Sequence, residues 1–290
     1  MAERGELAQW LHRRARNATS TVGRVTAPWR LEPSFLIVGA QRAGTTSMYK
    51  TLTEHPEVLG AGLHKGVHYF DTHYDKGPKW YRGHFPTRWS ARRTQRSTGN
   101  EPITGEASPY YMFHPLVPQR IAQELPGAKV IVMLRDPVER AYSAFTHETA
   151  RGFETEPFER AIELEEVRLA GVEEKFAADP YFQSLEHQHN AYLARGRYVE
   201  QLERLEHHVG RENIHVVDSD ELFVDAEPLI RETVEFLGLS PWAPASLQKR
   251  NARPRRSLEG EVRERLERYF EPYDERLAAW CGRTPSWRTP

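Results

Sequence analysis

The sequence predicts an α/β fold: a doubly wound, central parallel sheet with helices on both faces. Short apolar runs recur along the chain, and each is followed by a segment whose apolar residues have helical spacing. The clearest run is KVIVMLR, residues 129–135, which is continuous and apolar, as expected of a central strand buried on both faces. Such an alternation of strands and helices favours a parallel sheet, whose ligands bind at the carboxyl ends of the strands.

The composition of the 290 residues fits one large α/β domain. The formal net charge of −1 argues against a protein dominated by sequence-independent nucleic-acid binding. Cys281 is the only cysteine, so no internal disulfide can form and a reducing compartment is expected. No stretch approaches 18 apolar residues, and the amino terminus lacks the apolar region of a secretory signal. These features predict a soluble, cytoplasmic protein without a membrane span; the oligomeric state stays open.

Two regions are expected along the chain. Residues 1–32 form a polar amino-terminal arm, and residues 33–290 form a single domain. In the arm, Leu7, Trp10 and Leu11 recur at helical spacing, which predicts a short amphipathic helix. Packing of this helix on the domain is favoured over contact with an anionic surface.

The first predicted strand leads through a glycine turn into a helix. Residues 34–53 read SFLIVGAQRAGTTSMYKTLT, with a strand at 35–38, a turn from Gly39 to Gly44 and a helix from Thr45. In such a connection the loop N–H groups and the helix dipole together form a site for an anion. The alternative is an ordinary strand-turn-helix connection in which the glycines serve only the turn.

The turn differs from the loop of nucleotide triphosphatases, G-x-x-x-x-G-K-[ST]. Gly39 and Gly44 keep the glycine spacing and Thr46 keeps the hydroxyl, but Thr45 stands where the lysine belongs. The basic residue is Arg42, inside the loop. The loop therefore suits a phosphate but lacks the lysine that reaches the β- and γ-phosphates. This predicts a nucleotide with a short 5′ group.

The remaining elements are expected in chain order. The strands are a brief one at 58–59 and longer ones at 103–106, 129–135 and 213–217. The helices are one from Asp136-Pro137, mostly helical residues at 158–205 with breaks near Asp179-Pro180 and Gly196, one at 226–237, and an amphipathic helix at 259–280 broken at Pro272. An irregular surface excursion is expected at 76–100 and a basic loop at 247–257.

A second anion site is expected where the strand at 129–135 ends. Arg135 is its last residue, and Ser143 follows two turns into the next helix. A guanidinium and a hydroxyl at a strand end form a good phosphate clamp, provided that the helix folds back over the strand end. Together with the Arg42 loop, this site would hold a nucleotide that carries phosphates at both its 5′ and 3′ ends.

The segments FLIVGAQRAGTTSMYKTL and KVIVMLRDPVERAYSAFTHE resemble the two cofactor motifs of sulfotransferases that use PAPS, 3′-phosphoadenosine 5′-phosphosulfate. The segments HKGVHYFD, WYRGHFP, GEASPYY and ARGRYVEQLERL extend the resemblance to the heparan-sulfate type and its bacterial relatives, over about residues 35–280. The resemblance implies a P-loop-like nucleotide site and in-line transfer of a sulfuryl group from PAPS to a hydroxyl or amine. The acceptor would be a small molecule or a glycan, and no metal would be required.

The resemblance also implies roles for individual residues. Arg42 would contact the 5′-phosphosulfate, and Arg135 and Ser143 would bind the 3′-phosphate. The other donor-binding residues that it implies are Gln41, Ala43, Gly44, Thr45, Thr46, Ser47, Asn251 and Arg253.

The chain departs from the family at the expected base. The family pattern K-E-x-H-F-F-D reads K-G-V-H-Y-F-D here, so Gly66 replaces a glutamate that takes the acceptor proton. His68 is the predicted base and Glu106 the second candidate; each has a structural alternative, as a loop-holding histidine or a buried carboxylate. Ala107 replaces a family lysine, and Lys65 either takes over that role or is a surface lysine.

Two other functions stay open. A small-molecule kinase is disfavoured by Thr45 at the lysine position, and a non-catalytic nucleotide-binding module is suggested by Gly66 and Ala107.

Three further groups of residues have a simple interpretation. The histidines at 187, 189, 207 and 208 fit no zinc spacing and are expected to be exposed on helices. The glutamates between 163 and 174 are expected on a solvated helix face. The arginines at 88, 92, 93 and 96 either receive an anionic acceptor or lie on a solvated surface loop.

Overall fold

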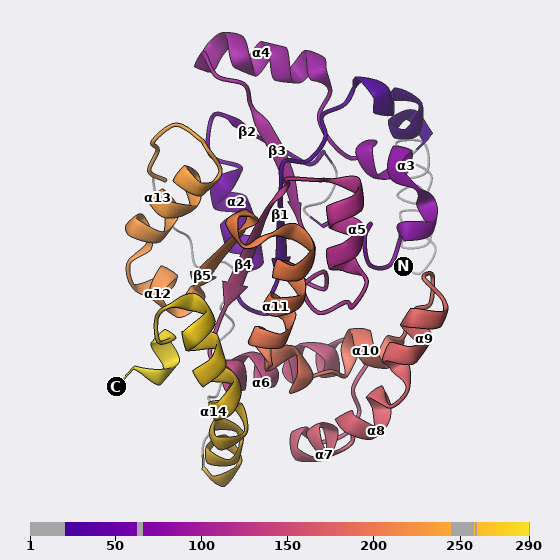
Figure 1. Ribbon diagram of the computed structural model, residues 1–290, viewed down its shortest axis with the longest axis vertical. Coiled ribbons are helices and arrows are strands. Elements are labelled where there is room, and N and C mark those ends of the chain that lie inside the picture. Colours follow the sequence, from indigo (N-terminus) through magenta and orange to yellow (C-terminus); the bar gives the residue numbers. More distant parts are fainter. Residues whose placement is uncertain (1–20, 63–65, 245–257, 259, 290) are drawn as a thin grey trace, which may run out of the picture.

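A five-stranded parallel sheet forms the centre of the molecule (Figure 1), in a computed structural model that describes residues 21–62, 66–244, 258 and 260–289. The strand order is β2-β3-β1-β4-β5, and every neighbouring pair is parallel. The strands are β1 (Phe35–Gly39), β2 (Val58–Gly60), β3 (Ile103–Ala107), β4 (Lys129–Leu134) and β5 (Ile214–Asp218). The predicted fold class is confirmed.

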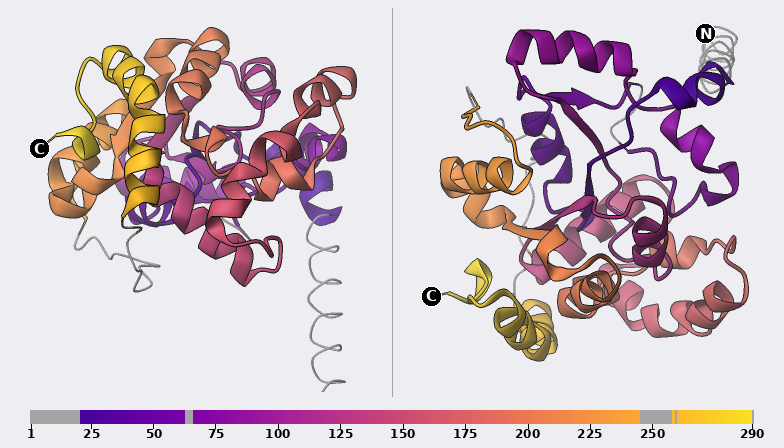
Figure 2. Two further views of the ribbon diagram at one scale, coloured as in Figure 1. Left: turned by 90° about the horizontal axis from the view of Figure 1, so that it is seen from below. Right: turned by 45° about the horizontal axis from the view of Figure 1, so that its top comes forward.

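Helices cover both faces of the sheet (Figures 1 and 2). The α-helices are α2 (Thr45–Leu52), α3 (Pro78–Arg82), α4 (Arg88–Thr98), α5 (Val117–Glu124), α6 (Pro137–Ala150), α7 (Phe158–Glu163), α8 (Glu165–Leu169), α9 (Val172–Ala178), α10 (Leu185–His189), α11 (Tyr198–Val209), α12 (Ser219–Val224), α13 (Ala226–Phe236) and α14 (Glu261–Cys281). Short 3-10 turns are η1 (Ala27–Trp29), η2 (Tyr74–Lys76), η3 (Ala194–Gly196), η4 (Arg211–Asn213) and η5 (Ser286–Arg288).

The connections explain which helices share a face. The chain passes from β1 through α2 to one edge of the sheet, and from β3 through α5 in the opposite direction, so right-handed crossovers place α2 and α5 on opposite faces. Edge strand β5 shows the same division: His215 stacks on Phe236 of α13, whereas the adjacent Val216 lines a cavity with Cys281 of α14. The sheet is therefore enclosed between two helical layers.

The core is densest at β1, where every residue is buried. Strand β3 approaches β1 so closely that Gly105 has no room for a side chain, because a Cβ there would lie 2.4 Å from the carbonyl oxygen of Phe35. A smaller core forms outside the sheet between α6, α7 and α14, around Tyr192 and Phe270. This second core fixes α6, which also passes beside the β1 loop.

Two predicted segments differ in the structure. The excursion at 76–100 contains α3 and α4 rather than irregular chain; α4 begins where the Thr87 hydroxyl accepts a hydrogen bond from the Ser90 N–H and ends at the left-handed Gly99. The helix at 259–280 was predicted to break at Pro272, but α14 continues through it. Burial of Leu266 and Phe270 on the core side of α14 outweighs the hydrogen bond that proline removes.

The remaining strand and helix predictions are confirmed to within a few residues. Strand β4 ends at Leu134, so Arg135 is the first residue beyond it. Residues 1–20, with the helix expected around Trp10, lie outside the described residues, while residues 21–26 are helical. In the described part of the chain, no helix combines the length and apolarity needed to cross a membrane.

Candidate functional site

Three segments meet at the carboxyl ends of the neighbouring strands β3, β1 and β4, with β1 in the middle. The β1 loop contains Arg42, the segment after β4 contains Arg135, and the segment around His68 is held against the end of β3. Because all three strands are parallel, these side chains are brought to the same side of the molecule.

The β1 loop has the backbone expected of an anion site. Arg42 has φ 74° and Gly44 has φ 89°, so the chain turns sharply before α2 begins at Thr45. Thr45 and Ser47 are buried, which holds the first turn of α2 rigidly behind the loop. The Ser219 hydroxyl at the start of α12 donates to the carbonyl oxygen of Ala43 and fixes the loop from the β5 side. The first-turn N–H groups of α2 therefore point toward the loop.

The two predicted anion sites meet at one contact. Nε of Arg42 donates a hydrogen bond of 3.1 Å to the Ser143 hydroxyl, which is buried on α6. The helix thus does fold back over the strand ends, as the phosphate clamp requires. The contact is made by Arg42 of the β1 loop rather than by Arg135.

Arg135 has a different set of partners. Its Nη2 lies 3.4 Å from Oε2 of Glu139 one turn along α6, and its carbonyl oxygen accepts a hydrogen bond of 2.9 Å from the Tyr198 hydroxyl. Asp136 caps α6 by accepting from the Val138 N–H at 2.8 Å. The structure therefore does not join Arg135 to Ser143, and the shared 3′-phosphate role of the two residues stays a prediction.

A buried network holds Gln41, and it was not anticipated from the sequence. The Gln41 side chain donates to Oε1 of Glu148 at 3.3 Å and accepts from Nη1 of Arg195. Oε2 of Glu148 lies 3.0 Å from Nδ1 of His189, and the Arg195 guanidinium lies 4.9 Å from the centre of the Tyr110 ring. Arg195 belongs to the ARGRY string, which was the one sequence signal pointing to it.

Two buried arginines leave donors unused beside this network. Arg140 is fully buried one turn before Ser143, and its Nε and Nη1 find no hydrogen-bond partner within the described ranges; the same is true of Nε of Arg195. Burial lowers the pKa of Arg195 to about 10, still well above neutral pH. An arginine side chain keeps its proton at neutral pH, so Arg140 is a cation as well. The carboxylates of Glu148 and Glu165 lie near enough to offset part of this positive charge.

His68 is oriented by a carboxylate. Its Nδ1 lies 2.8 Å from Oδ2 of Asp71, whose side chain is fully buried, while the imidazole is 37% exposed. A carboxylate can only accept, so Nδ1 holds the proton and Nε2 is left as the basic nitrogen. The His68 N–H donates to the Ser108 hydroxyl at 3.0 Å, which ties this residue to the end of β3 despite its φ of 55°.

Glu106 organises the same loop from beneath. This fully buried carboxylate accepts from the Val67 N–H at 2.6 Å, the Ser108 hydroxyl at 2.7 Å and the Tyr111 hydroxyl at 2.8 Å. Burial raises its pKa, although these hydrogen bonds oppose the shift. The contacts match the structural alternative for Glu106, and its role as a base stays a prediction that its burial disfavours.

Gly66 leaves no room for the glutamate of related enzymes. A Cβ at this position would lie 2.8 Å from the carbonyl oxygen of Ala107 and 3.5 Å from Nε2 of His68. The absence of a side chain therefore lets the loop lie flat against the end of β3, with the basic nitrogen of His68 close by.

Some predicted residues lie outside the described residues, and two interpretations hold only in part: His207 and the glutamates at 163, 166, 173 and 174 are exposed as expected, but other members of both groups are not. Lys65, Asn251 and Arg253 fall in the parts of the chain that are not described. The histidines at 187 and 189 are buried rather than exposed, and so is Glu165, whose carboxylate accepts three successive backbone N–H groups from residues 192–194. Among the described residues, no cluster of three His, Cys, Asp or Glu side chains could hold a metal ion.

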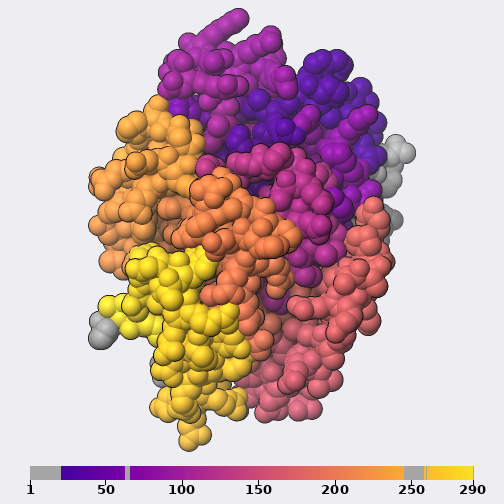
Figure 3. Space-filling view, viewed as in Figure 1, coloured from indigo at the N-terminus to yellow at the C-terminus, as the bar shows by residue number. Residues whose placement is uncertain are grey.

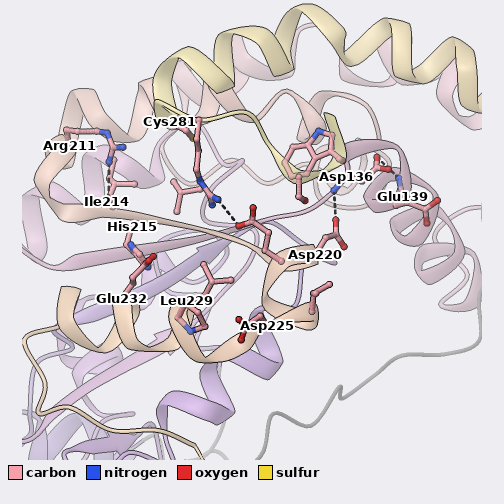
Figure 4. A pocket seen from close by; sticks show the side chains of 17 residues that line it. Asp136, Glu139, Arg211, Ile214, His215, Asp220, Asp225, Leu229, Glu232 and Cys281 are labelled. Carbon is pink, nitrogen blue, oxygen red and sulfur yellow. Dashed lines mark hydrogen bonds and ion pairs between the residues drawn. The ribbon is translucent and has the colours of Figure 1, made fainter. Parts of the chain in front are cut away.

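A cavity lies beside this site, on the β5 side of Asp136 and Glu139. It has a volume of about 990 Å³ and lies between β5, α12, α13 and the end of α14 (Figure 4). Its lining includes six carboxylates and two arginines, one of which, Arg283, pairs with Glu221 at 2.7 Å. None of the predicted donor-binding residues lines it. An acidic cavity of this kind does not suit a nucleotide phosphate.

Comparison with known proteins gives a consistent result. A family model described as "Sulfotransferase domain" matches residues 32–253. The chain is 24% identical to the membrane-associated sulfotransferase kil1 of Dictyostelium discoideum, over 88% of this chain and 66% of that protein. It is 30% identical to the human bifunctional heparan sulfate N-deacetylase/N-sulfotransferase 2, over 72% of this chain but only 22% of that protein.

A solved structure is similar over nearly the whole chain. The sulfotransferase from Alicyclobacillus acidocaldarius is 29% identical with a TM-score of 0.64, over 89% of this chain and 100% of that one. A further relative, the human heparan sulfate glucosamine 3-O-sulfotransferase 5, is 25% identical over 88% of this chain and 74% of its own length.

Proposed function

The chain belongs to the sulfotransferase family, and we propose that it transfers a sulfuryl group from PAPS to an acceptor hydroxyl, with His68 as the base. The observation that supports this most is the order of groups along the strand ends. The Arg42 loop lies in the middle, Arg135 and Ser143 lie on the β4 side, and His68 lies on the β3 side. A donor and an acceptor would approach the loop from opposite sides, as in-line transfer requires.

The residues of the β1 loop suit the donor. PAPS would supply an activated sulfuryl group whose departure leaves negative charge on the 5′-phosphate. Arg42 and the first turn of α2 would stabilise that charge, and the buried cations Arg140 and Arg195 add positive potential without direct contact. Arg135 and Ser143 would hold the 3′-phosphate. Such a set of donors needs no metal ion.

His68 and Asp71 suit the proton transfer. In the reaction the acceptor oxygen forms a bond to sulfur, the bond from sulfur to the 5′-phosphate oxygen breaks, and the acceptor proton passes to Nε2 of His68. Asp71 would fix the imidazole through Nδ1 and stabilise the imidazolium that forms. Glu106 would act as a positioning residue beneath the loop.

The acceptor is proposed as a hydroxyl or an amine of a small molecule or a glycan. Two relatives named above act on heparan sulfate, a glycan, according to their names. We place the reaction in the cytoplasm because the chain has a single cysteine.

Turnover and binding together test the proposal. The purified chain is incubated with PAPS and either a phenol or an oligosaccharide, and release of adenosine 3′,5′-bisphosphate is measured without added metal. We expect turnover that falls by about 10²- to 10⁴-fold in His68→Ala, with unchanged bisphosphate affinity. A chain that binds ATP more tightly than the bisphosphate, or a His68→Ala variant with wild-type kcat, would contradict the proposal.

A further inference from the structure

The end of the sheet opposite the donor loop carries an exposed surface with no assigned role. It consists of helix α4 and residues 21–29, which we call the amino-end surface. α4 leads into β3 and the segment after residue 29 leads into β1, so both elements lie where these strands begin. Figures 1 and 3 show them at the same end of the molecule.

The outward face of α4 combines a tryptophan with arginines. Trp89, Arg92, Arg93 and Arg96 are spaced i, i+3, i+4 and i+7 and are all exposed, while Ala91 faces the protein. Trp89 is 72% exposed. In the described part of the chain none of these three arginines has an acidic partner, and residues 86–100 contain no Asp or Glu at all. The outward face of α4 therefore carries positive charge that no neighbouring carboxylate among the described residues balances.

The neighbouring segment adds exposed apolar side chains. Val22, Val25 and Trp29 are all exposed, Trp29 by 64%. Their helix packs through its other side, where a Cβ on Gly23 would lie only 2.8 Å from the carbonyl oxygen of Gly83. A β-bridge between Arg30 and Thr87, the residue that caps α4, joins the two elements.

We propose that the amino-end surface docks on an anionic lipid bilayer. Arginines beside exposed tryptophan and valine match an interface that has anionic headgroups above an apolar interior, whereas a soluble polyanion would use only the charges. Four exposed apolar side chains and uncompensated arginines occur together only at this end of the described molecule. Docking there would leave the strand ends with Arg42 and His68 facing away from the bilayer, open to an acceptor in solution.

Vesicle co-sedimentation of the full chain tests this inference. Vesicles of phosphatidylcholine alone are compared with vesicles that also contain phosphatidylserine, at 0.1 M salt. We expect the wild type to partition onto the anionic vesicles only, and R92Q/R93Q/R96Q to lower the partition coefficient by about a hundredfold. Trp89→Ala should lower it as well, because an interfacial tryptophan is lost.

Control variants remove the same number of arginines, and one exposed apolar side chain, from other surfaces of the protein. R231Q/R265Q/R268Q changes three exposed arginines of α13 and α14, and Val224→Ala changes an exposed apolar residue of α12. Both controls should partition like the wild type. The inference is overturned if the α4 variant behaves like its control, if neutral vesicles bind equally well, or if the surface binds heparin but neither kind of vesicle.

None of these variants touches the donor loop, so PAPS turnover in solution should be unchanged in all of them. Failure of vesicle binding would leave the proposed reaction standing, and failure of the reaction would leave the docking result standing.

Discussion

At the scale of single residues, the proposed proton transfer depends on how His68 is held. The imidazole is partly exposed, but its orientation is set by the buried carboxylate of Asp71, while the Ser108 hydroxyl holds the backbone by accepting from the His68 N–H. The family pattern that the sequence resembles has a glutamate where this chain has Gly66, and a Cβ here would lie 2.8 Å from the carbonyl oxygen of Ala107. The proposed base is therefore a histidine–aspartate pair.

Replacement of Asp71 by asparagine tests this pair. The amide would no longer compel Nδ1 to hold the proton, so Nε2 would lose its role as the basic nitrogen for part of the time. We expect kcat to fall by on the order of a hundredfold while bisphosphate affinity stays within about twofold.

Asp75→Asn is the matched control, because Asp75 is an exposed neighbour that pairs with Lys76 at 2.9 Å. It should have wild-type kcat. An Asp71→Asn variant with the same kcat as this control would show that the carboxylate has no part in proton transfer.

Replacement of Gly66 by alanine should damage the same loop. The new methyl group would meet the Ala107 carbonyl oxygen at 2.8 Å, so the loop must move and carry His68 with it. We expect kcat to fall at least tenfold with little change in donor affinity, because a displaced base cannot align with the acceptor. Gly62→Ala, where a Cβ would lie 3.6 Å from its nearest neighbour, is the control and should keep full activity.

At the scale of elements, α6 connects the reaction site to the outer helices. It presents Ser143 to Arg42 and Glu148 to Gln41, both from a buried face. The chain beyond its end is fixed by Glu154, which accepts from Arg168 of α8 at 2.6 Å and from the Tyr192 hydroxyl at 2.9 Å. The position of the β1 loop thus depends on helices that are distant in sequence.

Removal of the Glu154 charge should cost stability in a pH-dependent way. Burial alone would raise the pKa of Glu154, but the hydrogen bonds from Arg168, the Glu156 N–H and Tyr192 lower it to about 2. A lowered folded-state pKa adds stability above the unfolded value, and this stability is lost as pH falls toward 2. Glu154→Gln should therefore lower the free energy of unfolding by about 3 kcal/mol at pH 7 but only about 1 kcal/mol at pH 3.

Urea unfolding of both proteins at the two pH values measures the difference. The exposed Glu159, replaced by glutamine, serves as the control and should cost little at either pH. An equal loss at pH 7 and pH 3 for Glu154→Gln would show that its charge is not what holds the outer helices.

At the scale of the whole molecule, the fold could be predicted because its signals are local. Continuous apolar runs mark β1 and β4, and Gly39, Arg42 and Gly44 mark the loop between β1 and α2. Helix α4 was missed because only Ala91 of its eleven residues is buried, which leaves no apolar periodicity to detect.

Two contacts of the site that the sequence did not indicate depend on long-range packing. The Arg42–Ser143 contact joins residues 101 positions apart, and the Arg195–Gln41 contact joins residues 154 positions apart. Neither contact follows from the spacing of residues in the sequence. The first requires α6, and the second requires η3, to fold back over the strand ends. Asp71 lies inside a quoted string, but its contact with His68 needs a left-handed turn that the letters do not reveal.

In the proposed complex, the Arg42 loop holds one end of the nucleotide, and Arg135 and Ser143 hold the other end. This arrangement is measured by calorimetry with adenosine 3′,5′-bisphosphate, adenosine 5′-monophosphate and ATP, on the wild type and Arg135→Gln. We expect the bisphosphate to bind more tightly than ATP, and Arg135→Gln to weaken the bisphosphate by about 10- to 100-fold while changing the monophosphate by less than about twofold. Equal weakening of both ligands, or tighter binding of ATP than of the bisphosphate, would show that Arg135 does not hold a 3′-phosphate.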